Sequence, residues 1–277
     1  MTGHTARPLP MPNLTQFRAL LIDLDGVVWI GETPLPGLEE FFNCLHARDL
    51  QFLLVSNNAA TSPEIVQSKL AGMGIEVTQG KVLTSSEASA SFLADRLPPG
   101  TPVLVVGEAG LRSAVERAGL TLAGGADDAR AVVVGLDRQA NWSSLTEAAL
   151  AIRRGALFVA TNPDVTFPIE RGLALGSGAL IAALKAATGL EPVMVGKPEP
   201  HLYIQAMARL RSSPEETLAV GDRLETDILG GRRAGISTAL LLSGVTRRED
   251  LERSPIRPDW VFEGLPGLTR ALCADGE

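Results

Sequence analysis

The stretch Ala19–Ile22 (ALLI), which runs directly into Asp23–Gly26 (DLDG), decides the fold of this chain. An uninterrupted apolar run of this length is typical of a strand that is buried on both faces of a parallel sheet. Two carboxylates, Asp23 and Asp25, stand at its end. Open α/β sheets bind their ligands outside the carboxyl ends of their strands. We therefore expect both aspartates to lie in a functional site.

Three further segments repeat this pattern of a short apolar run followed by polar residues. They are Phe52–Val55 before Ser56-Asn57-Asn58, Pro192–Val195 before Lys197-Pro198, and Thr217–Val220 before Gly221-Asp222, which continues to Asp227. Together the four segments supply carboxylates, a hydroxyl, amides and one lysine. These are the groups that the transfer of a phosphoryl group through an aspartate requires.

Four aspartates would converge in such a site: Asp23, Asp25, Asp222 and Asp227. Their carboxylates would repel one another and raise one another's pKa unless a cation were present. Magnesium suits an all-oxygen site that also holds a phosphate. Lys197 adds a compact positive charge, and Ser56 can donate a hydrogen bond to a phosphate oxygen. The residues alone do not say which aspartate attacks phosphorus and which one moves the proton.

The four segments, in this order, resemble the motifs of the haloacid dehalogenase (HAD) superfamily of aspartyl-phosphate hydrolases. The resemblance implies that Asp23 is the nucleophile and that Asp25 is the general acid and base, with its backbone carbonyl on the metal. The Mg²⁺ ligands that it implies are Asp23, Asp25 and Asp222. The phosphate-binding residues that it implies are Ser56, Asn57 and Lys197. The supporting residues that it implies are Gly26, Asn58 and Asp227.

Longer stretches are similar to the nitrophenylphosphatase-like, or NagD-like, group of subfamily IIA. They are DLDGVVWIG from Asp23, SNNAATSP from Ser56, TNPDVTFP from Thr161 and GDRLETDI from Gly221. The group includes sugar phosphatases, nucleotidases, and glycerol-phosphate and pyridoxal-phosphate phosphatases. The resemblance implies a phosphomonoester hydrolase for small phosphorylated metabolites, and a homodimer formed through the cap. One departure is Leu175-Gly176-Ser177, where the family often has Pro-Gly.

A second alternating block of strands and helices separates the second motif from Lys197. Its predicted strands are 103–106, 131–134 and 157–160, and its predicted helices are 111–118, 145–154 and 179–187. Ser144 and Glu147 predict a capping box at the second helix. Because the motifs on both sides belong together, this block is an insertion that covers the site as a lid.

The sequence therefore predicts a doubly wound parallel α/β core with an inserted α/β cap. The core is expected over residues 14–87 and 191–277, and the cap over residues 88–190. The family resemblance implies that this cap is of the larger α/β kind, called C2. We expect residues 1–13 to form a flexible tail.

Three polar cap residues are candidates for contact with the leaving group: Asp137, Asn162 and Asp164. Asn162 and Asp164 follow a predicted strand, where they either cap the next segment or face the core and shape the pocket. This mixed set favours no particular leaving group. Trp29, just after the first motif, is expected to pack in a flap and not to stack on a ligand.

Composition excludes several classes of protein. The net charge of −7 over 277 residues argues against a nucleic-acid-binding surface. No apolar run reaches the roughly 18 residues of a membrane helix, and residues 1–12 lack the apolar core of a secretory signal. Two cysteines, Cys44 and Cys273, are too few for a disulfide framework, so we expect a cytoplasmic protein with Cys44 in the core.

Several other activities use similar groups. A phosphorylation-receiving signal module would be about half as long and would lack the inserted lid. A dehalogenase of the same superfamily usually lacks the second aspartate of the first motif, which is present here as Asp25. A phosphotransferase or mutase of the superfamily shares the acids, and a non-catalytic phosphate-binding protein would need only part of them. These last two remain the alternatives to a phosphatase.

Overall fold

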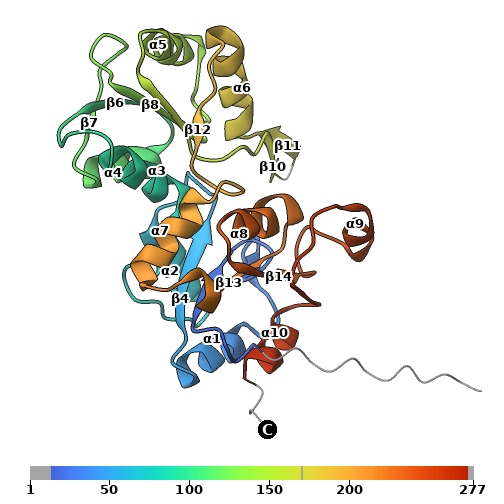
Figure 1. Ribbon diagram of the computed structural model, residues 1–277. Helices are drawn as coiled ribbons and strands as arrows, with labels where there is room; N and C mark the ends of the chain where they lie inside the picture. The colour runs from blue at the N-terminus through green and yellow to red at the C-terminus, as the bar shows by residue number, and fades with distance from the viewer. Residues whose placement is uncertain (1–13, 170, 274–277) are drawn as a thin grey trace, which may run out of the picture.

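The computed structural model describes residues 14–169 and 171–273, which form two α/β units (Figure 1). The expected tail, residues 1–13, lies outside the described residues. The lower unit in Figure 1 holds both the N-terminal and the C-terminal parts of the chain, and the middle of the chain forms the upper unit. The structure confirms the predicted class, a parallel α/β core with an inserted α/β cap.

The core is built on a six-stranded sheet in which all neighbouring strands pair in parallel. Its strands, in spatial order, are β15 (Trp260–Phe262), β14 (Ser237–Leu241), β13 (Thr217–Gly221), β1 (Ala19–Ile22), β4 (Gln51–Ser56) and β5 (Val82–Thr84). Its helices are α1 (Leu38–Ala47), α2 (Pro63–Gly72), α7 (His201–Leu210), α8 (Leu229–Arg233), α9 (Arg248–Arg253) and α10 (Leu265–Leu272).

Strand β1 lies at the centre of this sheet and is buried on both faces. Leu20 and Ile22 pack in one apolar cluster with residues of α1 and α10. Leu21 points to the other face and packs in a second cluster with Leu202 and Tyr203 of α7. Successive side chains of a strand alternate between the two faces, so a run of four apolar residues suits a sheet that helices cover on both sides.

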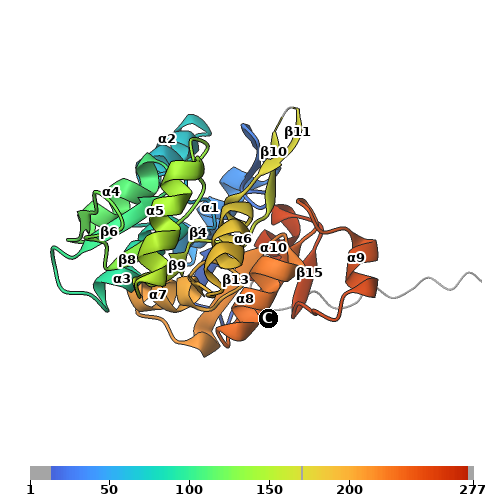
Figure 2. The ribbon, with the colours of Figure 1, turned by 90° about the horizontal axis from the view of Figure 1, so that it is seen from above.

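The cap has its own five-stranded parallel sheet, with helices packed on it. Its strands are, in spatial order, β12 (Val193–Met194), β9 (Leu157–Ala160), β8 (Ala131–Val134), β6 (Pro102–Val106) and β7 (Thr121–Leu122). Its helices are α3 (Ser85–Ala94), α4 (Ala109–Arg117), α5 (Trp142–Arg153) and α6 (Ser177–Thr188). Figure 2 shows the antiparallel hairpin of β10 (Thr166–Ile169) and β11 (Gly172–Leu175) projecting from this unit.

The strand expected over Pro192–Val195 belongs to the cap sheet and not to the core, where the prediction placed it. Val193 pairs with Val159 and Met194 with Ala160, both of β9. A two-residue strand carries too little pattern to reveal its partner, so the motif order alone suggested the core. The division at residue 191 therefore falls too early, because the chain leaves the cap sheet only after Met194.

Helix α5 begins earlier, and with a different cap, than the sequence suggested. The Asn141 side chain accepts hydrogen bonds from the backbone N–H groups of Ser143 and Ser144, and the Ser144 hydroxyl accepts one from the Asn141 N–H. Glu147 instead accepts a hydrogen bond from the Ala126 N–H in the loop between β7 and β8. The predicted pairing of Ser144 with Glu147 was therefore wrong.

Cys44 and Cys273 form a disulfide, although two cysteines are too few for a disulfide framework and led us to expect a cytoplasmic protein. Cys44 lies in α1, and Cys273 follows α10, with 6.3 Å between their Cα atoms. The two helices pack side by side across the core, although 229 residues of chain separate the cysteines. The prediction of a cytoplasmic protein therefore loses the support that the low cysteine count gave it.

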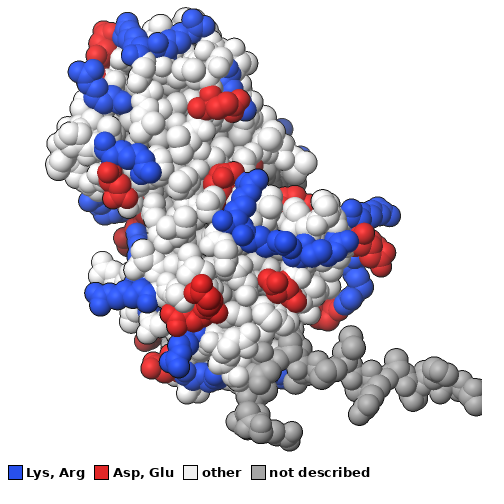
Figure 3. All heavy atoms as spheres, in the orientation of Figure 1, with Lys and Arg blue, Asp and Glu red and all other residues white. Residues whose placement is uncertain are grey.

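Acidic and basic groups lie close together on the face of both units that Figure 3 draws. Arg248 at α9 forms an ion pair with Glu263, and Arg233 of α8 forms one with Glu199. The absence of a nucleic-acid partner stays a prediction from the net charge. None of the helices within the described ranges has the length and apolar character needed to cross a membrane.

Candidate active site

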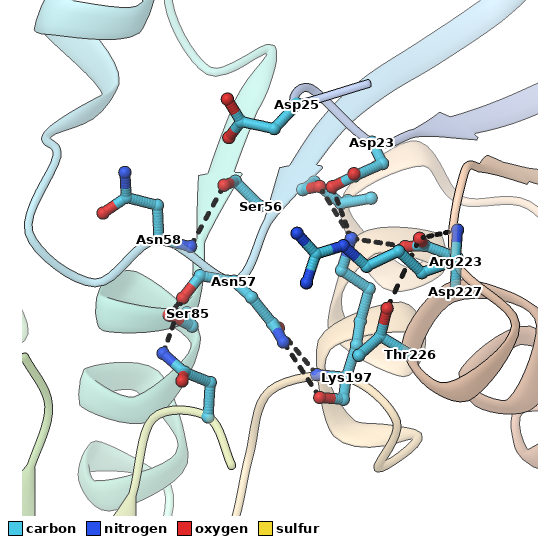
Figure 4. Close-up of polar contacts among 12 residues, drawn as sticks. Asp23, Asp25, Ser56, Asn57, Asn58, Ser85, Lys197, Arg223, Thr226 and Asp227 are labelled. Carbon is cyan, nitrogen blue, oxygen red and sulfur yellow. Dashed lines mark hydrogen bonds and ion pairs between the residues drawn. The ribbon is translucent and has the colours of Figure 1, made fainter. Parts of the chain in front are cut away.

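The four motifs meet at one edge of the core sheet, as Figure 4 shows. Asp23 directly follows β1, and its N–H donates to Val220 O of the neighbouring strand β13. Ser56 ends β4, the other neighbour of β1. Because β4 and β13 flank β1 in parallel, the residues at their carboxyl ends lie beside Asp23.

Lys197 is the centre of a buried charge network. Its ammonium lies 2.5 Å from Asp23 Oδ1 and 2.7 Å from Asp227 Oδ1, and it also donates to Val55 O at 3.3 Å. The side chain is only 2% exposed. Burial alone would lower the pKa of Lys197, but Asp227 and Asp23 outweigh it, so the pKa lies well above its ordinary value. The lysine is therefore a fixed positive charge.

Burial raises the pKa of Asp23 well above its ordinary value. Lys197 opposes this shift, while the carboxylates of Asp227 and Asp222 add to it. Three acids around one ammonium leave an excess of negative charge. Such a site favours the binding of a further cation.

Asn57 holds Lys197 from the side. Its Oδ1 accepts a hydrogen bond from the Lys197 N–H at 2.8 Å, and its Nδ2 donates to Lys197 O at 2.9 Å. The side-chain amide therefore fixes the backbone of the lysine. The Asn57 carbonyl in turn accepts hydrogen bonds from Ser85 Oγ and Asn162 Nδ2. This residue thus joins the second motif, the lysine motif and the cap.

Ser56 and Asn58 form the wall opposite Lys197. The buried Ser56 hydroxyl accepts a hydrogen bond from the Asn58 N–H at 3.1 Å. Asn58 Oδ1 accepts one from the Ala60 N–H at 2.9 Å, as an amide at a turn does. Figure 4 shows Ser56 Oγ lying between Asn58 and the Asp25 carboxylate. The hydroxyl hydrogen of Ser56 is left for another acceptor.

Asp222 is 1% exposed and is held by a loop that sequence reasoning missed. Val245 N–H donates to its Oδ2 at 2.6 Å, and Thr246 N–H donates to its backbone carbonyl. A Cβ on Gly26 or on Gly244 would lie 2.3 Å or 2.0 Å from Oδ2, so only glycine fits at either position. Gly26 also has φ +82, which favours glycine.

The donor set fits a hard divalent cation. Asp23, Asp222 and Asp227 each offer a carboxylate oxygen, and these atoms lie within 4.8 Å of one another. Asp222 Oδ1 is buried without a hydrogen-bond partner in the described part of the chain, an arrangement that a bound ion explains. Oxygen ligands of this kind select magnesium or calcium and not zinc.

The oxygens of Asp227 are already engaged. Its Oδ1 pairs with Lys197, and its Oδ2 accepts hydrogen bonds from Arg223 N–H at 3.1 Å and Thr226 Oγ1 at 3.4 Å. It lies in a π-helical turn, Leu224–Ile228, directly after β13. The supporting role that the family resemblance implies for Asp227 stays a prediction.

Burial, followed by the repulsion of Asp227, raises the pKa of Asp222 to about 6. Val245 N–H and the positive charges of Arg223 and Lys197 act in the opposite direction. A carboxylate with this pKa binds a proton in mildly acidic solution. Proton binding and cation binding at Asp222 therefore exclude each other.

A cavity of about 390 Å³ lies between this edge and the cap. All four motif segments of the site contribute residues to its lining, and the cap contributes residues of its facing loops. Cap residues that line the cavity are Leu136, Arg138, Asn162, Asp164, Phe167, Gly176 and Ser177. A ligand bound by the catalytic edge would therefore contact the cap with its other end.

The three cap candidates differ in their placement. Asn162 is buried and bridges to the core through Asn57 O at 2.8 Å, while its Oδ1 accepts from Asp164 N–H and Ser177 Oγ. Asp164 lines the cavity, and burial raises the pKa of its carboxyl group, against the influence of Arg223 and Lys197. Asp137 does not line it: its carboxylate accepts the Gln139 N–H within its own turn.

Arg138 and Arg223 are cavity residues that the sequence did not single out. Arg138 follows Asp137, and its Nε lies 3.5 Å from Glu108 Oε1. Arg223 follows Asp222, and Figure 4 shows its guanidinium group pointing toward the centre of the site. Each arginine directly follows a predicted site residue, Asp137 or Asp222, and this adjacency in sequence is the signal that could have found it.

Two family models match the chain. Residues 20–121 match the model described as haloacid dehalogenase-like hydrolase, and residues 194–268 match one described as HAD-hydrolase-like. An acid sugar phosphatase of Staphylococcus aureus (strain NCTC 8325 / PS 47) is 36% identical over 252 residues, which cover 91% of this chain and 96% of the relative. The 5'-nucleotidase YutF of Bacillus subtilis (strain 168) is 39% identical over 249 residues, which cover 90% of this chain and 96% of the relative.

Solved structures agree with these relatives. A 4-nitrophenylphosphatase from Thermotoga maritima is 31% identical and superposes with a TM-score of 0.88, covering 94% of this chain and 98% of that one. A glycerol phosphate phosphatase from Mycobacterium tuberculosis, in complex with magnesium, is 38% identical and superposes with a TM-score of 0.85. The match covers 96% of this chain and 82% of that one. The chain therefore belongs to the haloacid dehalogenase-like hydrolases, as a phosphatase of their nitrophenylphosphatase-like, NagD-like group.

Proposed function

We propose that the chain is a magnesium-dependent phosphomonoester hydrolase that works through an aspartyl-phosphate intermediate. The observation that carries this proposal is the pairing of Asp23 with the buried Lys197, beside the unpartnered Asp222 Oδ1. A carboxylate with a fixed cation on one side and a cation-binding oxygen on the other can approach a phosphate dianion. The relatives named as phosphatases support the same reaction class.

The first step forms a bond between a carboxylate oxygen of Asp23 and phosphorus, and it breaks the bond from phosphorus to the ester oxygen. Asp25 donates a proton to the departing alkoxide. In the second step Asp25 takes a proton from water, and the water oxygen attacks phosphorus. The bond from phosphorus to Asp23 then breaks, which releases inorganic phosphate and regenerates the free carboxylate.

The other motif residues bind and orient the phosphate. Lys197 places its charge beside Asp23, and the Ser56 hydroxyl can donate a hydrogen bond to a phosphate oxygen. Asn57 holds the Lys197 backbone through its side-chain amide. The family resemblance implies that it also binds the phosphate. Magnesium, held by Asp23, Asp222 and the Asp25 backbone carbonyl with Asp227 in support, would neutralise charge on the phosphate.

We infer that the substrates are small phosphorylated metabolites such as sugar phosphates or nucleotides, together with nitrophenyl phosphate. A cavity of about 390 Å³ accommodates a leaving group of that size. Asp164 and Arg138 stand on the cap side of the cavity and can accept and donate hydrogen bonds to hydroxyl groups. The names of the relatives, a sugar phosphatase and a 5'-nucleotidase, support this class.

Two further proposals rest on the family resemblance or on composition. A homodimer formed through the cap is one, and sedimentation velocity tests it. A cytoplasmic location is the other, and fractionation of the cells that produce the protein tests it.

The experiment that tests the function is a measurement of phosphate release from a panel of phosphate esters, with magnesium and after chelation. The panel contains sugar phosphates, nucleotides, glycerol phosphate, pyridoxal phosphate and nitrophenyl phosphate. We expect release that chelation abolishes and added magnesium restores. Transfer of the phosphate to a second position of the substrate, without release, would indicate the mutase. Binding of a phosphate ester with neither release nor transfer of its phosphate would indicate a non-catalytic phosphate-binding protein.

A further inference from the structure

Trp29 contacts the proposed general acid directly. Its indole Nε1–H donates a hydrogen bond of 2.9 Å to Asp25 Oδ1. Trp29 begins the flap strand β2 (Trp29–Ile30), which pairs with β3 (Thr33–Pro34), and is 4% exposed. The sequence predicted a packed flap residue, and the structure adds a polar contact between this residue and the site.

The indole ring is fixed from several sides. The backbone N–H of Gly26 donates to Trp29 O at 2.7 Å, which closes the loop that carries Asp25. Lys69 of α2 places its ammonium 4.4 Å from the centroid of the Trp29 ring. The same ammonium pairs with Glu32 in the flap at 3.2 Å. Turning the ring would therefore break its contacts with Asp25 and with Lys69 of α2.

Asp25, in contrast, is exposed and has few restraints of its own. Among residues 14–169 and 171–273 its carboxylate accepts a hydrogen bond from Trp29 alone. Figure 4 shows this carboxylate turned toward the Ser56 side of the site and away from Lys197. An exposed aspartate without such a contact would divide its time among several rotamers.

We propose that Trp29 is a positioning residue for proton transfer: its N–H holds Oδ1 of Asp25, so that the transferable proton resides on Oδ2. An indole N–H donates and cannot accept, so the oxygen that it contacts cannot direct a proton toward Trp29. The free oxygen is then the one that gives the proton to the leaving group and later takes one from water. This inference rests on the proposed function, because it presumes that Asp25 is the acid.

The test compares substrates whose leaving groups differ in basicity. Replacing Trp29 with phenylalanine (Trp29→Phe) removes the donor and keeps an aromatic ring. For a sugar or glycerol phosphate, whose alkoxide must be protonated, we expect kcat/KM to fall roughly tenfold, the size of one hydrogen bond to a charged group. We compare kcat/KM because it reports the steps up to departure of the leaving group and not the later attack by water, which is the same for every substrate. For nitrophenyl phosphate, whose leaving group is weakly basic, the fall should be several times smaller.

Two controls distinguish positioning from general damage. Trp260 packs edge-on against Phe17 in the core, 5.5 Å between ring centroids, so Trp260→Phe should lower activity on both substrates equally or not at all. In an Asp25→Asn background, Trp29→Phe should cause no further loss, because no acid remains to be positioned. Equal losses of kcat/KM on both substrates for Trp29→Phe, or none, would overturn the proposal.

A spectroscopic measurement keeps the proposal testable if Trp29→Phe fails to fold. The chain has three tryptophans, so its proton NMR spectrum holds three indole N–H signals, which Trp142→Phe and Trp260→Phe assign. We expect the Trp29 signal to lie downfield and to move upfield in Asp25→Asn, since an amide oxygen is a weaker acceptor. An unmoved signal would refute the hydrogen bond. Inactivity of the wild-type chain on all esters would instead refute the proposed function and leave this contact intact.

Discussion

The catalytic edge of the core and the facing loops of the cap use charged side chains in opposite ways. Lys197 in the core is 2% exposed and has two carboxylates within 2.7 Å. Arg138 in the cap is 64% exposed and has one carboxylate, Glu108, at 3.5 Å. The first arrangement fixes every group through its neighbours, whereas the second leaves most of a guanidinium group free. We infer that the core determines the reaction and that the cap loops determine which leaving group is accepted.

The largest expected effect comes from the nucleophile itself. Asp23→Asn removes the attacking carboxylate, so we expect phosphate release to fall by at least about a thousandfold on every substrate. The fold should remain, because Lys197 keeps Asp227 as a partner. Steady-state assays with thermal unfolding as the control test this expectation. A well-folded Asp23→Asn chain with activity near that of the wild type would refute the assignment of Asp23.

Lys197 should affect stability as well as activity. Lys197→Met leaves two buried carboxylates without their cation, and breaking a buried pair in this way costs about 3–5 kcal/mol of stability. The matched variant is Lys185→Met on the cap surface, where the ion pair with Glu191 is exposed and contributes less than about 1 kcal/mol. Urea unfolding measures both. Equal losses of stability in Lys197→Met and Lys185→Met would contradict the view that the buried ion pairs contribute more than the exposed one.

The raised pKa of Asp222 predicts a specific pH dependence in the metal-free chain. The folded state binds a proton with a pKa of about 6, above the value of about 3.9 in unfolded chains, so this contribution to stability is present at low pH. It is lost as the pH rises through about 6, and it amounts to about 2 kcal/mol between about pH 4 and about pH 7.5.

Asp222→Asn provides the control for that titration, because the amide does not bind a proton. Its metal-free stability should lack this part of the pH dependence, and its stabilisation by added magnesium should be small. In the wild type we expect magnesium to stabilise the fold more at about pH 7.5 than at about pH 5, since protons and cation compete at Asp222. Thermal unfolding with and without magnesium measures this, and equal stabilisation at both pH values would contradict it.

The smallest effect, and the most selective, is expected in the cap. Arg138→Gln should reduce kcat/KM for sugar phosphates or nucleotides by less than about tenfold and leave nitrophenyl phosphate unchanged, because one exposed hydrogen-bonding group contributes about 1 kcal/mol. Arg154→Gln, which removes an exposed pair with Asp127 away from the cavity, should change neither. A loss shared by all substrates would place Arg138 in the reaction and not in leaving-group selection.

Strongly patterned segments of the fold could be predicted, and weakly patterned ones could not. Ala19–Ile22 and Ala131–Val134 appear as strands with the predicted bounds, because continuous apolar runs reflect burial on both faces. Strand β12 has two residues, and its pairing with β9 depends on the whole cap. The disulfide depends on the packing of α1 against α10, which no local pattern records.

The same distinction holds for the site. Asp23 and Asp222 could be placed at the catalytic edge because they directly follow the buried strands β1 and β13. Lys197 lies three residues beyond the half-buried β12, and only the order of the motifs placed it there. The Val245 N–H, which holds Asp222, is a backbone donor and leaves no mark in the residue type. In the cap, Asp137 was a predicted contact, but its carboxylate accepts the Gln139 N–H within its own turn, and the neighbouring Arg138 lines the cavity instead. Side-chain direction within a loop requires the tertiary structure.

The most direct test of the central claim is to trap the phosphorylated enzyme. Asp25→Asn should slow attack by water, so a brief reaction with nitrophenyl phosphate and magnesium, stopped in acid, should leave phosphate on the chain. Borohydride then reduces an aspartyl phosphate to homoserine, which peptide mass spectrometry locates. We predict homoserine at position 23 alone. Modification at another aspartate, or none while phosphate is released, would contradict the account.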